Sequence, residues 1–332
     1  MIKKEELIFL DKIQRLKSEN RFLIDYANLV SGIFKFQSKL LNKKSILKFE
    51  KNKQFGLPIL IPKGLNIFDY EDKNYFIYGK GKILKHFYGL KKRNYQPFKE
   101  IFKYGQIYSS DLKPKKKYLK LINKINNYNY CVKDKIKILR SKHKSVAAFQ
   151  TRNIPHLGHE KILSYLLENT NHVVINPLIG PKKKGDVAPY KIYLSFKYLN
   201  KYYGNRISFL PIIANMFYAG PREAIHHSLI RENFGFTHFT IGRDHAGHGN
   251  YYPYYLATKM AKKSVSKLDI KLLFHYGSFW HSKYNKIVLM KKLNNNKFLE
   301  NISGSEFRNC LKKKVLYKFA RKDLQNYLIK KL

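Results

Sequence analysis

The sequence predicts an α/β fold in which a mixed, mostly β domain precedes a Rossmann-like core built on a parallel sheet. From about residue 140 onward, short apolar segments alternate with amphipathic segments of helical length, the pattern of a parallel sheet covered by helices on both faces. Residues 1 to about 138 lack this alternation and contain short apolar pieces between turn signals. With 332 residues, the chain has room for about two domains.

The elements of the core follow one another in a regular order. Apolar runs predict strands, and apolar residues spaced three or four apart predict helices. The predicted strands are Val146–Gln150, Val173–Ile179, Ile207–Ile213 and Thr237–Gly242. The predicted helices are Glu160–Asn169, Pro189–Tyr203 and Pro221–Asn233, the last of which ends at Gly235.

The first part of the chain is expected to begin with two helices and to continue with short strands. Apolar pieces at Leu57–Ile61, Tyr75–Tyr78 and Ile101–Tyr108 predict these strands. The Lys- and Asn-rich stretch Lys113–Lys137 is interpreted as a linker. The predicted divisions are therefore residues 1–138, a core at 139–300, and a C-terminal helical segment at 301–332.

The chain is strongly basic, with 66 Lys and Arg against 22 Asp and Glu and a formal net charge of +44. This charge alone would indicate nucleic acid or an anionic membrane surface. Only 11 of these residues are Arg, however, and the chain is also rich in Asn, Ile, Tyr and Phe, whose codons are rich in A and T. Coding bias therefore explains most of the lysine, and a nucleic-acid-binding protein stays an alternative interpretation.

Two features of the sequence indicate the cellular compartment: the small number of cysteines and the charged residues of the N-terminal segment. Cys131 and Cys310 are too few for a disulfide framework or a four-cysteine metal site, which fits a reducing compartment. Charged residues interrupt the first 17 residues, so this segment resembles neither a signal peptide nor a membrane span. We expect a cytoplasmic protein that does not enter a membrane.

Four unusual segments follow the four predicted strands. In an open parallel sheet, ligands bind beyond the carboxyl ends of the strands. The segments are Gln150–His159, Gly180–Asp186, Asn215–Glu223 and Gly242–Gly249. We therefore expect all four at one edge of the sheet.

The first of these segments carries His156 and His159 at the start of a helix, on either side of Gly158. Imidazoles beside the free N–H groups of a helix N-terminus suit a polyphosphate, and Gly158 would let the backbone approach the ligand. A capping or surface pair is the simpler interpretation, and no Cys or carboxylate cluster supports a metal pair.

Amide and guanidinium groups suited to an oxyanion precede these histidines and recur in the fourth segment. Gln150, Arg152 and Asn153 offer fixed donors, and the glycine-rich loop Gly242–Gly249 adds Arg243. Two arginine-bearing loops at one sheet edge favour an anion site over two solvated turns.

A further segment near the C-terminus, Ile302–Arg308, reads as a loop that enters a helix. Ser305 is the predicted N-cap of this helix, and Arg308 lies one turn inside it. The segment is either an ordinary cap or a helix start that closes over phosphates.

Five segments together resemble a known family. They are QTRNIPHLGHE (Gln150–Glu160), NPLIGPKKKGDV (Asn176–Val187), NMFYAGPREAIHHSLIRENFG (Asn215–Gly235), IGRDHAGHGNYY (Ile241–Tyr252) and ISGSEFR (Ile302–Arg308). In this order they are similar to the successive signature segments of ATP sulfurylases. The HxGH and ISGSxxR elements by themselves indicate only the wider nucleotidyltransferase superfamily. More loosely, Asp25–Phe34, Gly56–Pro62 and Tyr88–Leu90 resemble the PUA-like N-terminal domain of this family.

The resemblance implies sulfate adenylyltransferase activity, in which ATP and sulfate give adenylyl sulfate and pyrophosphate, or the reverse. A sulfate oxygen would attack the α-phosphorus in line, so no protein nucleophile is needed. Implied catalytic residues are Thr151, Arg152, Asn153, His156 and His159. Implied sulfate ligands are Gln150, Arg152, Arg243 and Ala246. Implied ATP ligands are Thr151, Asn153, His156, His159, Gly242, Arg243, Asp244, His245 and Val288.

The resemblance also implies that Mg²⁺ accompanies ATP, that the protein is a homo-oligomer and that it binds no specific nucleic acid. Zinc is not expected, because the stretch His275–His281 lacks the cysteines that some relatives carry there. Other departures are Ile154 before Pro155, together with His248 and Tyr255 at the rim of the site. The alternative enzyme is another nucleotidyltransferase of this superfamily with a different acceptor.

Overall fold

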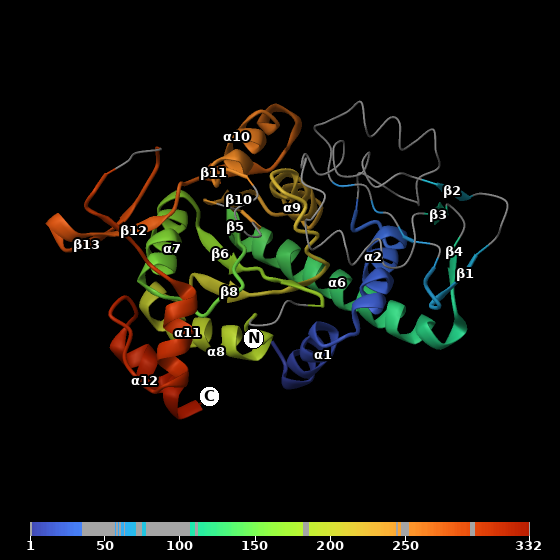
Figure 1. The fold of residues 1–332 in the computed structure, drawn as a ribbon, viewed down its shortest axis with the longest axis horizontal. Helices are drawn as coiled ribbons and strands as arrows, with labels where there is room; N and C mark the ends of the chain where they lie inside the picture. Colours follow the sequence, from blue (N-terminus) through green and yellow to red (C-terminus); the bar gives the residue numbers. More distant parts are fainter. Residues whose placement is uncertain are drawn as a thin grey trace.

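A five-stranded parallel sheet forms the centre of the computed structural model, which describes residues 2–34, 57, 59, 61–62, 64–70, 75–77, 107–109, 112–181, 186–243, 245–246, 252–292 and 296–331 (Figure 1). Its strands are β5 (Val146–Phe149), β6 (His172–Ile175), β8 (Ile207–Phe209), β10 (His238–Ile241) and β11 (Lys271–Phe274). Their order is β11-β10-β5-β6-β8, and each neighbouring pair is parallel. The predicted α/β fold with a parallel sheet is confirmed.

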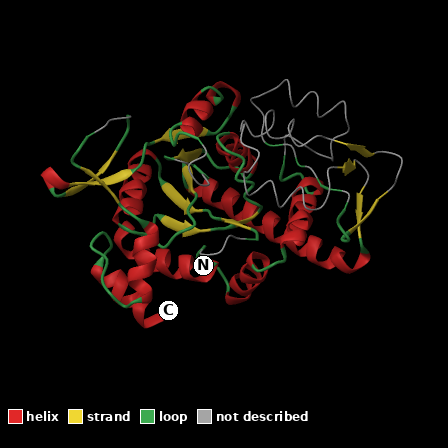
Figure 2. Cartoon of the chain, viewed as in Figure 1, coloured by secondary structure: helices red, strands yellow, loops and turns green. Residues whose placement is uncertain are grey.

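Helices cover both faces of this sheet, because successive side chains of a strand point to opposite faces (Figure 2). Ala147 and Phe149 pack in one hydrophobic core, whereas Val146 and Ala148 pack in the other. The first core contains residues of α7 (Leu157–Asn169), α8 (Pro189–Leu199), α11 (Gly304–Lys312) and α12 (Lys322–Lys331). The second contains residues of α6 (Lys116–Lys142), α9 (Arg222–Asn233) and α10 (Leu256–Lys262).

The direction in which the chain crosses the sheet reverses at β5. From β5 the chain runs outward through β6 to β8, and it then returns to the other side of β5 to form β10 and β11. The loops that follow β5 and β10 consequently leave the sheet toward opposite faces. Such a switch point opens a crevice at the carboxyl ends of the strands, where α/β proteins bind their ligands.

Prolines divide two of the predicted strands. Val173–Ile179 forms β6 and the short β7 (Leu178–Ile179), separated at Asn176 and Pro177. Ile207–Ile213 likewise forms β8 and β9 (Ile212–Ile213), separated at Leu210 and Pro211, and β7 pairs with β9 in parallel. Proline has no N–H to donate to a strand ladder, which explains why each predicted strand is broken at this point.

The predicted linker Lys113–Lys137 is wrong. Most of it belongs to α6, a helix of 27 residues whose apolar side chains at Ile122, Ile125, Val132 and Ile136 are buried. The abundant Lys and Asn obscured this helical spacing in the sequence. The linker interpretation failed because burial of one apolar stripe by tertiary packing is enough to stabilise a helix of poor composition.

The two predicted N-terminal helices are confirmed as α1 (Lys4–Gln14) and α2 (Arg21–Val30). Hydrogen bonds join α2 and α6 to the core: Asn28 and Asn129 each donate from Nδ2 to the Ile213 carbonyl at 2.9 Å. Asn129 also donates to Asn28 Oδ1 at 2.8 Å. These side chains of α2 and α6 therefore fix the end of β9, from which the chain continues to the edge of the sheet formed by the carboxyl ends of the strands.

Short antiparallel pairs make up the regular structure described between α2 and α6. β1 (Phe68–Tyr70) pairs with β4 (Leu112–Pro114), and β2 (Tyr75–Ile77) pairs with β3 (Ile107–Ser109). Of the segments behind the PUA-like assignment, all of Tyr88–Leu90 and three residues of Gly56–Pro62 (Gly56, Pro58 and Leu60) lie outside the described residues. The PUA-like domain and the three-part division of the chain stay predictions.

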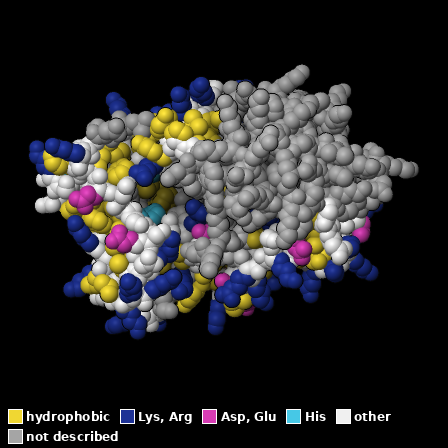
Figure 3. Space-filling view, in the orientation of Figure 1, with side chains coloured by type: hydrophobic (Ala, Val, Ile, Leu, Met, Phe, Trp, Pro, Cys, Tyr) yellow, Lys and Arg dark blue, Asp and Glu magenta, His cyan; other side chains and the backbone are white. Residues whose placement is uncertain are grey.

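A second sheet and two helices follow the core. The strands β12 (Ser278–His281), β13 (Lys286–Leu289) and β14 (Leu299–Asn301) form an antiparallel sheet in the order β13-β12-β14, and β12 and β13 contact α7. Among the described helices, none has both the length and the apolar character needed to cross a membrane. On the face in Figure 3, the described Lys and Arg side chains are spread over the surface and do not gather in one patch.

Candidate active site

A pocket of about 230 Å³ opens at the carboxyl ends of β5, β10 and β11. It is lined by Phe149, Gln150, Thr151, Arg152, Asn153, His159, Ile162, Met216, Thr240, Gly242, Arg243, His245, Ala246 and His275. The pocket brings together every predicted site residue except three. Asp244 lies outside the described residues, and His156 and Val288 are not part of the lining.

Two neighbours orient Arg152 in this pocket. Its Nη1 donates to the Tyr218 hydroxyl at 3.0 Å and lies 3.6 Å from Oδ1 of Asp186. The guanidinium carbon also lies 5.5 Å from the centre of the Tyr218 ring. Asp186 and Tyr218 belong to the predicted segments after the second and third strands. The described parts of all four segments therefore meet at one edge of the sheet.

The two predicted histidines have different surroundings. His156 is the N-cap of α7, and its Nδ1 accepts the N–H of Gly158 at 3.1 Å. His159 Nδ1 accepts the N–H of His156 at 3.4 Å, and the two ring centres are 4.0 Å apart. A neutral His159 therefore carries its proton on Nε2, where it is a donor in the pocket lining. His156 supports the orientation of the His159 ring through this hydrogen bond and ring contact.

The expectation of free N–H groups at this helix start is wrong. The helix α7 begins at Leu157, three residues before the predicted start, and the N–H of Leu157 donates to the Phe319 carbonyl at 2.8 Å. Gly158 packs closely against the protein and is not part of the pocket lining, because a Cβ there would lie 2.7 Å from Oγ of Ser278. The helix start therefore contributes its dipole and the His159 side chain to the pocket, and its first N–H groups are used inside the protein.

The second arginine-bearing loop follows β10. Arg243 donates from Nη1 to Asn301 Oδ1 at 3.0 Å, and its guanidinium carbon lies 5.0 Å and 5.3 Å from the ring centres of Tyr254 and Phe279. Ala246, which also lines the pocket, has a φ of +56°, a left-handed conformation that is uncommon for a residue with a side chain. A guanidinium held between two rings offers its remaining N–H groups to an anion in fixed directions.

The C-terminal motif reaches the first loop through one hydrogen bond. The helix α11 begins at Gly304, and Ser303 is its N-cap, accepting the N–H of Glu306 at 3.2 Å. The prediction that Ser305 is the cap is wrong by two residues, and Ser305 Oγ instead accepts from Arg308 at 3.0 Å. Arg308 Nη1 donates to Oδ1 of Asn153. The motif therefore orients a pocket residue without lining the pocket itself.

Val288 lies on β13 opposite Phe279 of β12. The Phe279 ring packs against the guanidinium group of Arg243, which lines the pocket, whereas Val288 itself does not line it. Its predicted role as an adenine contact stays a prediction.

A family model described as ATP-sulfurylase matches residues 132–330. The chain belongs to the ATP-sulfurylase family. The match begins within α6 and ends within α12, so it contains the entire parallel sheet and every described residue of the pocket.

Curated relatives are similar over about half of the chain. The sulfate adenylyltransferase of Staphylothermus marinus is 38% identical over 187 residues, covering 55% of this chain and 49% of that protein. That of Hyperthermus butylicus is 42% identical over 171 residues, covering 51% and 44%. That of Persephonella marina is 39% identical over 194 residues, covering 56% and 50%. The alignments thus span about half the length of these ATP-sulfurylase relatives.

A solved structure supports the fold at lower sequence similarity. The hexameric APS kinase from Thiobacillus denitrificans superimposes with a TM-score of 0.54 at 12% identity, covering 93% of this chain and 61% of that chain. This likeness concerns the arrangement of helices and strands alone.

Two polar residues of the ATP-sulfurylase pocket escaped the sequence prediction. His275 directly follows β11, and its only role in the sequence prediction is to begin the stretch that lacks zinc-binding cysteines. Its Nδ1 accepts the N–H of Gly277 at 3.2 Å, so a neutral ring carries its proton on Nε2. Thr240, on β10, is the second residue, and its buried hydroxyl has no hydrogen-bond partner among the described residues. Extending the strand-end rule to β11 would have found His275.

Close packing around His275 explains why the second loop begins with glycine. A Cβ at Gly242 would lie 2.5 Å from Cε1 of His275, which is closer than side-chain carbons approach. The two residues therefore bring the β10 and β11 strand ends into direct contact at the pocket floor.

The imidazoles of the site are neutral near pH 7. Burial lowers the pKa of His156 and of His275 to about 4, and it lowers the pKa of His159 and of His245 well below the ordinary 6.5. Among the described lining residues, permanent positive charge therefore comes from Arg152 and Arg243, and the imidazoles contribute as neutral donors.

We expect the free energy of unfolding to fall as the pH decreases from about 6.5 to about 4. In this window the unfolded chain binds protons at its histidines, whereas buried His156 and His275 bind none until about pH 4. Each histidine then costs on the order of 3 kcal/mol of stability at the lower end. Asp25 has the opposite effect on stability, because burial raises its pKa to about 6. Its contribution offsets the loss of stability caused by only one of these histidines. Urea unfolding at pH 6.5 and pH 4.5 measures the difference, and an unchanged midpoint would contradict it.

Proposed function

We propose that this chain transfers the AMP group of ATP to inorganic sulfate, giving adenylyl sulfate and pyrophosphate. One observation carries the proposal: two arginine-bearing loops, after β5 and β10, line one pocket at the switch point of the sheet. Membership of the ATP-sulfurylase family and the named relatives support this reaction.

Sulfate is assigned to the arginine side of the pocket. We propose that Gln150, Arg152, Arg243 and the backbone of Ala246 bind it. Tyr218 and Asp186 restrain Arg152, and Asn301 restrains Arg243, so both guanidinium planes are fixed before the anion enters. Fixed planar donors can bind two oxygens of a tetrahedral dianion at once, which a lysine cannot do.

The nucleotide is assigned to the histidine side. The proposed ligands are Thr151, Asn153, His156, His159, Gly242, Arg243, Asp244, His245 and Val288. Among them His159 has the clearest role, because its Nε2–H lies at the positive end of the α7 dipole and suits a phosphate oxygen. His156 contributes by holding that ring and capping the helix.

The chemistry needs no covalent intermediate with the protein. A sulfate oxygen attacks the α-phosphorus, the new S–O–P linkage forms, and the bond to pyrophosphate breaks on the opposite side. The residues proposed as catalytic, Thr151, Arg152, Asn153, His156 and His159, act by positioning and by stabilising the charge that develops on the phosphate oxygens. The same site runs the reverse reaction, which forms ATP from adenylyl sulfate and pyrophosphate.

Mg²⁺ enters this proposal as part of the substrate, bound to the phosphates of ATP. The described pocket lining contains arginine, histidine, amide and hydroxyl groups and no carboxylate, and the described residues include no cluster of three His, Cys, Asp or Glu placed to hold a metal. A donor set of this kind fits the oxygens of an anionic nucleotide better than a bare divalent cation.

Exchange of labelled pyrophosphate into ATP tests the function. With Mg²⁺ present, exchange is expected only when sulfate is added, and adenylyl sulfate should accumulate once pyrophosphate is removed. Absence of sulfate-dependent exchange would disprove the proposal. Exchange supported instead by a phosphorylated or carboxylated acceptor would favour the alternative nucleotidyltransferase. Homo-oligomer formation, a cytoplasmic location and the lack of specific nucleic-acid binding stay predictions.

A further inference from the structure

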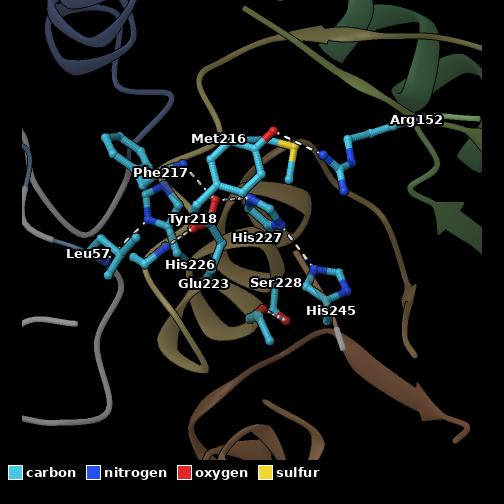
Figure 4. Close-up of polar contacts among 12 residues, drawn as sticks. Leu57, Arg152, Met216, Phe217, Tyr218, Glu223, His226, His227, Ser228 and His245 are labelled. Carbon is cyan, nitrogen blue, oxygen red and sulfur yellow. Dashed lines mark hydrogen bonds and ion pairs between the residues drawn. The ribbon is translucent and has the colours of Figure 1, made fainter. Parts of the chain in front are cut away.

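Glu223 is a fully buried carboxylate that lies outside the pocket lining and contacts two segments that lead to it (Figure 4). Its Oε1 accepts the N–H of Phe217 at 2.8 Å, and its Oε2 accepts the N–H of Ala219 at 2.6 Å. These two bonds enclose Tyr218, whose φ of +52° is rare for a residue with a bulky side chain. The carboxylate therefore stabilises a turn that the backbone itself disfavours.

The turn determines where the Tyr218 side chain lies. Its hydroxyl accepts a hydrogen bond from Nη1 of Arg152 at 3.0 Å, and its ring lies under the guanidinium group. In Figure 4 this contact spans the gap between the turn and the segment after β5. Glu223 is thus connected to one arginine of the pocket through a single side chain.

A second connection runs along α9. His227 stands one helical turn after Glu223, and both side chains are fully buried. Nε2 of His227 lies 3.1 Å from Oε1 of Glu223, and Nδ1 of His227 lies 3.0 Å from Nε2 of His245. The His245 ring lines the pocket. The same carboxylate is therefore connected to a residue from the other loop.

We infer that Glu223 is a positioning residue for both sides of the pocket: through Tyr218 it orients Arg152, and through His227 it orients His245. The sequence GPRE places this carboxylate at the start of α9, from which both contacts can be reached at once. The kinetic consequences of the inference rest on the proposed function, whereas its structural consequences do not.

The inference specifies the proton positions along the histidine connection. Oε1 of Glu223 lies 3.1 Å from Nε2 of His227, without the alignment of a hydrogen bond, and the negative charge at this distance favours the His227 tautomer with its proton on Nε2. Nδ1 of His227 is left as an acceptor, so Nε2 of His245 must donate to it. His245 is therefore held as a neutral ring with its proton on Nε2 and an unprotonated Nδ1. Burial, which lowers the pKa of both rings, favours these neutral forms.

Nuclear magnetic resonance of protein labelled with ¹⁵N at histidine and arginine tests the positioning without reference to activity. The chain has 12 His and 11 Arg, so both spectra are sparse, and Arg152→Lys and His245→Gln assign the two signals. In the wild type we expect the His245 signal of the Nε2–H form. Tyr218→Phe should shift the Arg152 Nε signal and leave His245 unchanged. His227→Gln should shift His245 and leave Arg152 unchanged, and Glu223→Gln should shift both.

His172 provides a control away from these connections. It is a buried histidine that begins β6 at the amino end of the sheet, and its Nε2 lies 2.7 Å from Oγ of Ser208. His172→Gln removes a buried imidazole as His227→Gln does, and it should shift neither signal. If Glu223→Gln does not fold, Tyr218→Phe and His227→Gln still test each connection separately.

Steady-state kinetics of the proposed reaction give the second measurement. Tyr218→Phe is expected to raise the KM for sulfate on the order of 10-fold, the effect of one hydrogen bond to a charged group, with the KM for MgATP changed less than about twofold. His227→Gln is expected to raise the KM for MgATP several-fold and to leave the KM for sulfate nearly unchanged.

The outcomes separate this inference from the proposed function. A protein without sulfate-dependent activity that still shows the crossed pattern of signals would disprove the function and support the positioning. A His245 ring with its proton on Nδ1, or Arg152 and His245 signals that respond equally to Tyr218→Phe and His227→Gln, would overturn the positioning role of Glu223. So would Tyr218→Phe and His227→Gln variants that raise both KM values alike.

Discussion

Replacement of Arg152 by lysine is expected to raise the KM for sulfate by about 10- to 100-fold while the KM for MgATP changes less than about threefold. A lysine keeps the positive charge but loses the planar pair of donors, the hydrogen bond to Tyr218 and the stacking on its ring. The loss of one or two charge-assisted hydrogen bonds gives this magnitude. Initial rates of pyrophosphate release, with sulfate and MgATP varied in turn, measure the two constants.

Arg206 offers a matched control for this substitution. It lies on the surface, where its guanidinium donates to the carbonyls of Leu167, Thr170 and Asn171. Arg206→Lys makes the same chemical change away from the pocket and is expected to leave both KM values unchanged. If Arg152→Lys used sulfate as well as the wild type does, the assignment of sulfate to this side of the pocket would be wrong.

Replacement of His159 by alanine is expected to lower kcat by about 100- to 1,000-fold with any oxyanion acceptor, because the lost donor is assigned to the phosphates. A donor fixed where charge develops in the transition state is worth this much when it is removed. The position of His159 depends on the His156 backbone and on ring contact with His156, so a smaller residue cannot restore it. Single-turnover rates with sulfate and with selenate measure the effect.

His172 is the control for His159. It is also a buried histidine, and burial lowers its pKa to about 4, but it begins β6 at the amino end of the sheet and bonds to Ser208. His172→Ala should reduce stability without a comparable loss of kcat. A His159→Ala variant with wild-type kcat, or one impaired with sulfate but not with selenate, would contradict the division of the pocket into a sulfate side and a phosphate side.

Periodicity in the sequence was sufficient to predict the parallel core. The strands at Val146, Val173, Ile207 and Thr237 begin within one residue of their observed positions, because buried parallel strands are nearly continuous apolar runs. Composition was misleading where abundant Lys and Asn obscured the spacing of the apolar residues. The predicted linker falls largely within the Lys- and Asn-rich α6, although the apolar stripe of this helix at 3–4 residue spacing is present in the sequence.

The different roles of His156 and His159 could not be predicted from the sequence. His156 and His159 are equivalent in the sequence, three residues apart at a helix start. The structure separates them, because Nδ1 of His156 is occupied by the N–H of Gly158 while the ring of His159 lines the pocket. Which of two neighbouring side chains is used as a cap depends on the direction in which the helix leaves the loop, and this direction is a property of the packed core.

By itself the sequence determined that the chain forms a parallel α/β core, that its polar segments follow the strands, and that Gln150, Arg152 and Arg243 lie together at one sheet edge, where the structure shows them lining one pocket. Local periodicity and the strand-end rule contain this information. Only the tertiary structure decided that buried Glu223 bonds to both sides of the Tyr218 turn and lies beside His227, and that His275 packs against Gly242 in the pocket lining. Contacts between residues far apart in sequence depend on strand order and helix packing, for which a single sequence carries no local signal.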